Sequence, residues 1–178
     1  PPKASDKHHE ALPYEQIPDF MANLREMDSL SALALEFTIL NASRTSESLK
    51  GLRSEVEGAL WTIPGNRMKA GKPHQVPLAQ RSLDILTIAQ GLDPESEYLF
   101  SRNGKPLSNM AMLMLVRRIQ SGLTVHGFRS TFRDWIAEET DYSPEVADMA
   151  LAHTISNKVE RAYRRGNLLG IRRNLMND

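Results

Sequence analysis

The chain has 178 residues, no cysteine, and equal numbers of basic and acidic residues, 22 of each. This length allows one domain with a proper core. The lack of cysteine excludes disulfides, thiolate metal sites and a cysteine nucleophile, and it is typical of a reducing cytoplasm. No apolar run approaches the roughly 20 residues that span a bilayer, so we expect no membrane partner.

Charge is distributed unevenly along the chain. Residues 1–60 carry six basic and ten acidic residues, whereas residues 156–173 carry six basic residues and one acidic residue. Proteins that bind a phosphate backbone usually have a basic excess. The neutral total is therefore unusual for a nucleic-acid protein, and the local basic cluster would have to supply the attraction. A solvated helix face is the simpler interpretation of this cluster.

An extended linker or arm is predicted over residues 1–13, which hold three prolines and no periodic apolar pattern. The adjacent His8 and His9 would diverge on a helix or a strand, so we predict no metal site there. The main domain is expected over residues 14–178. The chain begins with Pro1 and not with methionine, which we interpret as a piece of a longer protein.

Two helices are predicted next, because apolar residues recur at helical spacing over residues 14–27 and, more densely, over residues 29–42. Arg44 follows the second helix, which is apolar enough to be largely buried. Its guanidinium group would therefore extend from a rigid element. The alternative is an ordinary charged turn in which Arg44 pairs with Glu47, an i,i+3 contact worth only tenths of a kcal/mol.

A small antiparallel sheet is predicted over residues 52–78, where short apolar runs alternate with glycine and proline turns. A basic hairpin tip can reach a phosphate or keep a strand edge soluble, and the second role is commoner. The last turn of this region carries Arg67, Lys69, Lys72 and His74.

Helical spacing resumes over residues 81–90, and a turn at residues 101–106 precedes a further helix. We expect Ser108 to cap that helix and Gln120 to end it. Its three methionines are typical of flexible core filling rather than of a ligand site.

The most informative stretch runs over residues 125–165. His126 and Arg129 are three residues apart, which places them on the same face of a helix, where they can converge on one small anion. His153 ends the next predicted helix, which begins with a serine cap and a proline. Tyr163 follows ten residues later among basic residues, where it can serve as a nucleophile.

Two short helices are expected at the C-terminal end, over residues 157–163 and 168–176, and the sequence contains no internal repeat. The elements together predict an α+β domain that is mainly α-helical, with its strands confined to one small antiparallel sheet.

The order and spacing of these features resemble the catalytic domain of the tyrosine recombinases, specifically the phage- and island-type integrases. A lone H-x-x-R motif is common, but this set of segments in this order is specific. The matching segments are S-R-T-S-E, R-M-K-A-G-K-P-H-Q-V-P-L, T-V-H-G-F-R-S-T-F-R-D-W and A-L-A-H-T-I-S-N-K-V-E-R-A-Y-R-R-G. The resemblance covers roughly residues 17–178 and implies the recombinase catalytic fold with a three-stranded antiparallel sheet.

Carried over by position, the resemblance assigns the central catalytic roles. Arg44 and Arg129 would grip the two non-bridging oxygens of the scissile phosphate, a task suited to planar guanidinium groups. Tyr163 would be the nucleophile. A phenol ordinarily has a pKa near ~10, so it needs a proton acceptor, and His126 would fill that role.

The same resemblance assigns supporting roles. His153 would donate a hydrogen bond to the phosphate, and Glu47 would brace Arg44. Lys69, which lies seven residues before the valine of V-P-L, is favoured over Lys72 as the acid that protonates the departing 5′ oxygen. Contacts to the DNA backbone are expected from Arg67, Lys72, His74, Lys158, Arg164 and Arg165.

The implied reaction is covalent catalysis of site-specific DNA recombination, which integrates or excises a mobile element. A 3′-phosphotyrosyl link stores the energy of the broken bond, and a 5′ hydroxyl from the partner strand reverses the step. We therefore expect no ATP, metal or other cofactor. The sequence agrees, since it contains neither a Walker-type phosphate loop nor the clustered carboxylates of two-metal nucleases.

The resemblance also implies partners and a location. We expect double-stranded DNA attachment sites, further integrase protomers in a tetramer on paired DNA, and DNA-bending or directionality helper proteins, all in the cytoplasm of a bacterium. Ser46 replaces a glycine common in the arginine motif, and a small residue should be tolerated. No DNA-binding domain precedes Tyr14, so we expect this chain alone to bind DNA weakly and to recombine little or not at all.

Two alternatives stay open. A non-catalytic DNA-binding or regulatory module would keep the recombinase fold without the activity. An unrelated helical interaction domain would use the same residues as surface charges, and Arg44, Arg129 and Tyr163 would then lie far apart.

Overall fold

The computed structural model describes residues 11–153 and 166–178. Its helices are η1 (Tyr14–Gln16), α1 (Ile17–Arg25), α2 (Leu30–Leu40), α3 (Thr45–Leu49), η2 (Arg53–Glu55), η3 (Gly65–Arg67), α4 (Gln80–Leu92), α5 (Met110–Ile119), α6 (Gly127–Glu139), α7 (Pro144–Ala150) and α9 (Leu169–Asn177). Its strands are β1 (Val56–Glu57), β2 (Leu60–Ile63), β3 (His74–Pro77), β4 (Ser101–Arg102) and β5 (Lys105–Pro106).

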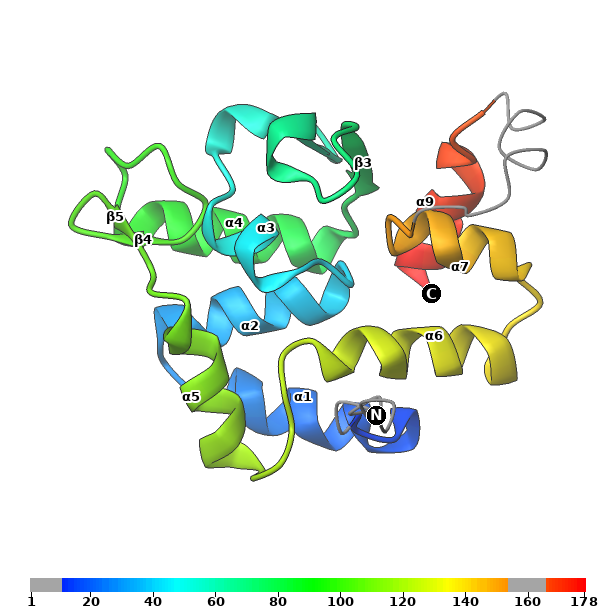
Figure 1. Cartoon of the computed structure of the whole chain (residues 1–178). Coiled ribbons are helices and arrows are strands. Elements are labelled where there is room, and N and C mark those ends of the chain that lie inside the picture. Colours follow the sequence, from blue (N-terminus) through cyan, green and yellow to red (C-terminus); the bar gives the residue numbers. More distant parts are fainter. Residues whose placement is uncertain (1–10, 154–165) are drawn as a thin grey trace, which may run out of the picture.

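Helix α2 forms the centre of the larger hydrophobic core. Ser29 caps it by accepting a hydrogen bond from the Ala32 backbone N–H at 3.1 Å. Apolar residues on every side of the helix are buried, as its sequence predicts. The Phe37 ring packs 5.4 Å, between centroids, from both Trp61 and Phe100. Helices α1, α4 and α5 surround α2 (Figure 1).

One buried carboxylate joins three of these helices. Glu36 of α2 is 2% exposed and pairs with Arg25 of α1 at 2.6 Å and with Arg81 of α4 at 2.7 Å. Burial alone would raise the pKa of Glu36, but the two guanidinium groups outweigh burial and lower it. The carboxylate stays charged and ties α1 and α4 to the central helix.

The predicted three-stranded antiparallel sheet is confirmed, with the strand order β1-β2-β3. Trp61 of β2 lies opposite Val56 on one side and Val76 on the other. Trp61 and Ile63 point to the core and are fully buried. Strand β3 is an edge strand, and α9 packs beside it (Figure 1). A separate hairpin of β4 and β5 forms the predicted turn at residues 101–106.

A smaller hydrophobic cluster lies where α6, α7 and α9 meet, and it contains Ile136, Val146 and Leu175. Helix α6 spans both cores, because Phe128 near its start packs on Phe20 of α1 with centroids 5.0 Å apart. Arg129 follows Phe128 directly and so lies where the two packed regions come together.

Several local predictions are wrong. Asn109, not Ser108, occupies the N-cap position of α5, and its side chain makes no capping bond. Only one methionine of α5 fills the core: Met112 is fully buried, whereas Met110 and Met114 are about half exposed. Ser143 precedes α7 as expected but makes no side-chain capping bond.

Leu12, which lies in the predicted linker, packs against the rest of the protein. Leu12 is buried, and its carbonyl accepts a hydrogen bond from the Thr131 hydroxyl at 2.6 Å.

Among the described residues, no helix is both long enough and apolar enough to cross a membrane. The predicted helix over residues 157–163 lies outside the described residues.

Candidate active site

Arg44 and Glu47 form a compact pair at the start of α3. One carboxylate oxygen of Glu47 accepts from the Arg44 guanidinium at 2.7 Å, and the other accepts from the Arg44 backbone N–H at 2.8 Å. Glu47 is buried, while a quarter of the Arg44 side chain is exposed. The carboxylate therefore fixes both the backbone and the guanidinium of Arg44, and part of this cation still faces solvent.

Arg129 is a second, deeper cation next to this pair. It is 5% exposed, and its two terminal nitrogens donate to the carbonyls of Ala42 and Leu151. Burial, and then the neighbouring charge of Arg44, lowers the pKa of Arg129 to about 10, while Glu47 opposes this change. Arg129 thus remains charged at physiological pH and lies within electrostatic range of Arg44 and Glu47.

A hollow of about 370 Å³ opens beside Arg44 and collects side chains from three elements. Its lining residues are Arg44, Thr45, Ser46, Lys50, Asn109 and His126. They come from α3 and its two ends, from the start of α5 and from the start of α6. The structure therefore brings the predicted Arg44 and His126 to one cavity, and none of the lining residues is acidic.

His153 lies just after α7 and is held by Asp148. Its Nδ1 is 3.2 Å from an Asp148 carboxylate oxygen, and its backbone N–H donates to the Asp148 carbonyl at 2.9 Å. If Nδ1 donates to the carboxylate, Nε2 can donate to a second group only when the ring is protonated. The contact therefore orients the ring.

Lys69 and Lys72 lie on the connection between β2 and β3, where both are exposed. Neither lysine lines the hollow beside Arg44. The connection closes tightly, because a Cβ added at Gly65 would lie 2.6 Å from the carbonyl oxygen of Gly71. The base of this loop is thus fixed, while its lysines extend into solvent.

The neighbouring Arg67 and His74 differ from the expectation of free DNA contacts. The Arg67 guanidinium pairs with Glu55 and donates to the Glu47 carbonyl at 3.1 Å. His74 is half-buried and donates to the Ala150 carbonyl. Both side chains thus tie the sheet to other parts of the protein.

Four predicted residues lie outside the described residues: Lys158, Tyr163, Arg164 and Arg165. After this segment the chain packs against β3. Asn167 donates to the Gln75 side chain at 2.8 Å, and Arg172 donates to the Gln75 carbonyl. Arg172 is only 2% exposed, so this residue of the basic cluster does not lie on a solvated helix face.

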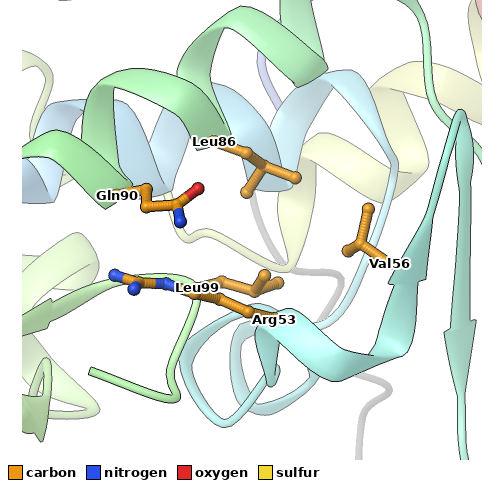
Figure 2. A pocket seen from close by; sticks show the side chains of 5 residues that line it. All are labelled: Arg53, Val56, Leu86, Gln90 and Leu99. Carbon is orange, nitrogen blue, oxygen red and sulfur yellow. The ribbon is translucent and has the colours of Figure 1, made fainter. Parts of the chain in front are cut away.

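A second pocket, of about 170 Å³, lies apart from these residues (Figure 2). Leu86 and Gln90 of α4 face Leu99 and Arg53 across it. Arg53 donates to the Pro94 and Asp93 carbonyls at 2.6 Å each, so its guanidinium closes the end of α4. This pocket holds none of the predicted site residues.

Residues 11–153 and 166–178 contain no group of three or more His, Asp or Glu side chains placed to hold a metal ion. The electrostatic character of the site is that of several cations around one carboxylate, which suits an anionic ligand.

Comparison with known proteins decides the family. The model of the phage integrase family matches residues 10–168, most of the chain. The chain belongs to the phage integrase family. Its mainly helical α+β fold and the recognised resemblance to integrases are both confirmed.

Two relatives illustrate the extent of the likeness. The chain is 34% identical over 179 residues to prophage integrase IntZ of Escherichia coli K12, covering 96% of this chain and 44% of that protein. It is 31% identical over 180 residues to the integrase of Shigella phage Sf6, covering 96% and 46%. The chain thus spans less than half the length of these relatives.

Solved structures agree on the fold. A lambda integrase tetramer bound to a Holliday junction matches with a TM-score of 0.66 and 16% identity, over 89% of this chain and 49% of that chain. XerA recombinase matches with a TM-score of 0.59 and 15% identity, over 92% and 65%. This family member therefore shares its architecture with proteins of very different sequence.

Sequence reasoning missed several residues of the site. Lys50 and Asn109 line the hollow, and the buried Arg172 lies near His74, which the sequence had suggested as a DNA contact. The mistaken cap at Ser108 concealed Asn109. No pattern in the sequence distinguishes Lys50 from an ordinary surface lysine, so only the folded structure could reveal it.

Proposed function

We propose that the chain is the catalytic part of a site-specific DNA recombinase that cleaves and rejoins DNA through a 3′-phosphotyrosyl intermediate. The observation that carries the proposal is the charge arrangement at the hollow. Arg44 and Arg129 lie around the single carboxylate of Glu47, and Lys50 and His126 add basic groups with no further acid. A phosphodiester would supply the missing negative charge.

The geometry supports distinct roles for the two arginines. Arg44 is partly exposed and can donate directly to a phosphate oxygen. Arg129 has five N–H donors, of which its contacts to Ala42 and Leu151 use two. Its remaining donors and its fixed charge would stabilise the pentavalent transition state.

The remaining roles follow the family resemblance. Tyr163 would attack the phosphorus and displace the 5′ oxygen, His126 would accept the phenol proton, and Lys69 would protonate the leaving oxygen. His153, oriented by Asp148, would donate to a non-bridging oxygen. Religation reverses these transfers, so the reaction needs no cofactor.

The partners and location are part of the same proposal. The substrate would be duplex attachment-site DNA in the bacterial cytoplasm, with helper proteins bending it. The lambda integrase to which the fold is similar forms a tetramer on a Holliday junction. That likeness supports a tetramer for the protein that contains this chain.

Covalent trapping tests the function. A nicked suicide duplex carrying the attachment sequence of the encoding mobile element loses a short fragment on cleavage, so even slow cleavage accumulates as a denaturation-resistant adduct. We expect Tyr163→Phe to abolish the adduct, because phenylalanine has no nucleophilic oxygen. Tyr142→Phe is the matched control. The Tyr142 hydroxyl donates a hydrogen bond to the Asp178 carboxylate at 2.6 Å and should be dispensable for trapping.

An adduct that survives Tyr163→Phe would show that another residue is the nucleophile. DNA binding by the unchanged chain without any adduct would indicate a non-catalytic module with the recombinase fold.

A further inference from the structure

The hollow beside Arg44 contains a cation that the recombinase reaction outlined above does not use. Lys50 lies at the C-terminal end of α3 and lines the same cavity as Arg44 and His126. Its ammonium group has no hydrogen-bond or ion-pair partner among residues 11–153 and 166–178. Lysine is rarely buried without a partner, but an exposed lysine in a hollow with no acidic side chain can bind an anion.

The backbone that carries Lys50 is fixed on both sides. Its N–H donates to the Ser46 carbonyl at 3.2 Å, and the preceding Leu49 is 1% exposed. The following Gly51 accepts from the Leu99 N–H at 2.8 Å, and a Cβ there would lie 2.5 Å from the Leu99 side chain. The lysine therefore extends from an anchored turn, and only its flexible side chain has to be ordered on binding.

The spacing of the two cations indicates which anion Lys50 would meet. Six residues of helix rise correspond to roughly 9 Å between Arg44 and Lys50 along the helix axis. Along one DNA strand the axial rise is about 3.4 Å per phosphate. With Arg44 on the scissile phosphate, Lys50 is placed for a phosphate about two or three nucleotides away.

We propose that Lys50 binds a DNA backbone phosphate about two or three nucleotides from the scissile phosphate and so fixes the register of the cleaved strand in the hollow. This inference rests on the proposed function, since it takes Arg44 as the ligand of the scissile phosphate. Lys50 is a DNA-binding residue and takes no part in proton transfer. Its contact is independent of base sequence, because it reaches only the backbone.

Equilibrium binding as a function of salt tests the contact. Removing one phosphate contact should reduce the slope of log K against log salt by about 0.9 and weaken binding about eightfold at 0.1 M salt. We expect this result for Lys50→Gln on any duplex, and near-complete recovery for Lys50→Arg. Asn109→Ala, which removes a neutral side chain from the same hollow, should leave the salt slope unchanged.

A methylphosphonate scan then locates the phosphate. Single neutral linkages are placed at the scissile position and at the three positions on either side, in duplexes whose cleavage point has been mapped from the trapped adduct. Lys50→Gln should not weaken DNA binding any further when the neutral linkage replaces the phosphate that Lys50 contacts. We expect this non-additivity at one flanking position.

The outcomes separate this inference from the proposed function. Adduct formation by the unchanged chain, with an unaltered salt slope in Lys50→Gln, overturns the Lys50 contact alone. Non-additivity at the scissile position also overturns it. A lower melting temperature of Lys50→Gln with an unaltered slope would make Lys50 a helix-end residue only. A chain that binds no duplex overturns both proposals.

Discussion

At the scale of single residues, His74 shows how the folded environment changes a side chain's chemistry. Its sequence position, on a basic hairpin, suggests a surface group. In the structure it faces Arg172 of α9, Glu47 of α3, Arg129 of α6 and the Ala150 carbonyl of α7. Burial, followed by the charge of Arg172, lowers its pKa to about 4. His74 is therefore a neutral donor at physiological pH.

This value predicts a pH-dependent stability. The unfolded chain takes up a proton at His74 near the ordinary pKa of about 6.5, whereas the folded chain does so only near pH 4. The free energy of unfolding should thus fall by on the order of 2 kcal/mol as the pH drops from about 6.5 to 4. Urea denaturation at stepped pH measures it.

His74→Gln keeps a donor for the Ala150 carbonyl but cannot titrate. The part of the fall in unfolding free energy that His74 causes at low pH should therefore disappear in this variant. His153→Gln is the control, because the His153 side chain is 38% exposed and should leave the decline in place. Parallel pH profiles for unchanged protein and His74→Gln would contradict the buried, neutral state.

At the scale of elements, the ends of helices build the site. Arg129 receives its carbonyl partners from the turns after α2 and α7, and both turns contain an alanine in the left-handed region: Ala42 has φ 45° and Ala152 has φ 49°. Such a backbone costs an L-residue roughly 1–2 kcal/mol. The strained turns lie beside Arg129, whose hydrogen bonds to the Ala42 and Leu151 carbonyls help to keep them in this conformation.

Relief of this strain can be measured at Ala152, which is only partly buried. Ala152→Gly should raise the free energy of unfolding by about 0.5–1 kcal/mol, because glycine accepts a positive φ without penalty. Ala137→Gly, on the exposed face of α6, should lower it by about 1 kcal/mol. Thermal or urea unfolding of the two variants should show opposite signs, and equal losses would refute the strain.

At the scale of the whole molecule, basic and acidic residues are equal in number, but one hollow is lined by basic side chains and by no acidic one. The net charge is zero, yet the hollow has no acidic lining, and the buried cation Arg129 lies near Arg44 at its edge. Positive potential is concentrated at this hollow, while the zero net charge gives little general attraction for a polyanion.

This balance predicts weak DNA binding by the chain alone. At physiological salt we expect a dissociation constant of about 1–100 µM with little sequence preference, and marked weakening as salt is raised. Fluorescence anisotropy with a labelled duplex at several salt concentrations measures it. Nanomolar, sequence-specific binding at low salt would contradict the prediction.

The sequence by itself determined the family, the fold class and the identity of most helices and strands, because apolar periodicity and four ordered motifs are local or sequential properties. It also indicated the Arg44–Glu47 contact, which joins residues only three apart. Tertiary structure alone decided that Arg67 and His74 point into the protein, that Arg172 is buried, and that Lys50, Asn109 and His126 share one hollow. These outcomes depend on distances between residues up to 100 positions apart in the chain, which packing sets and no local pattern records.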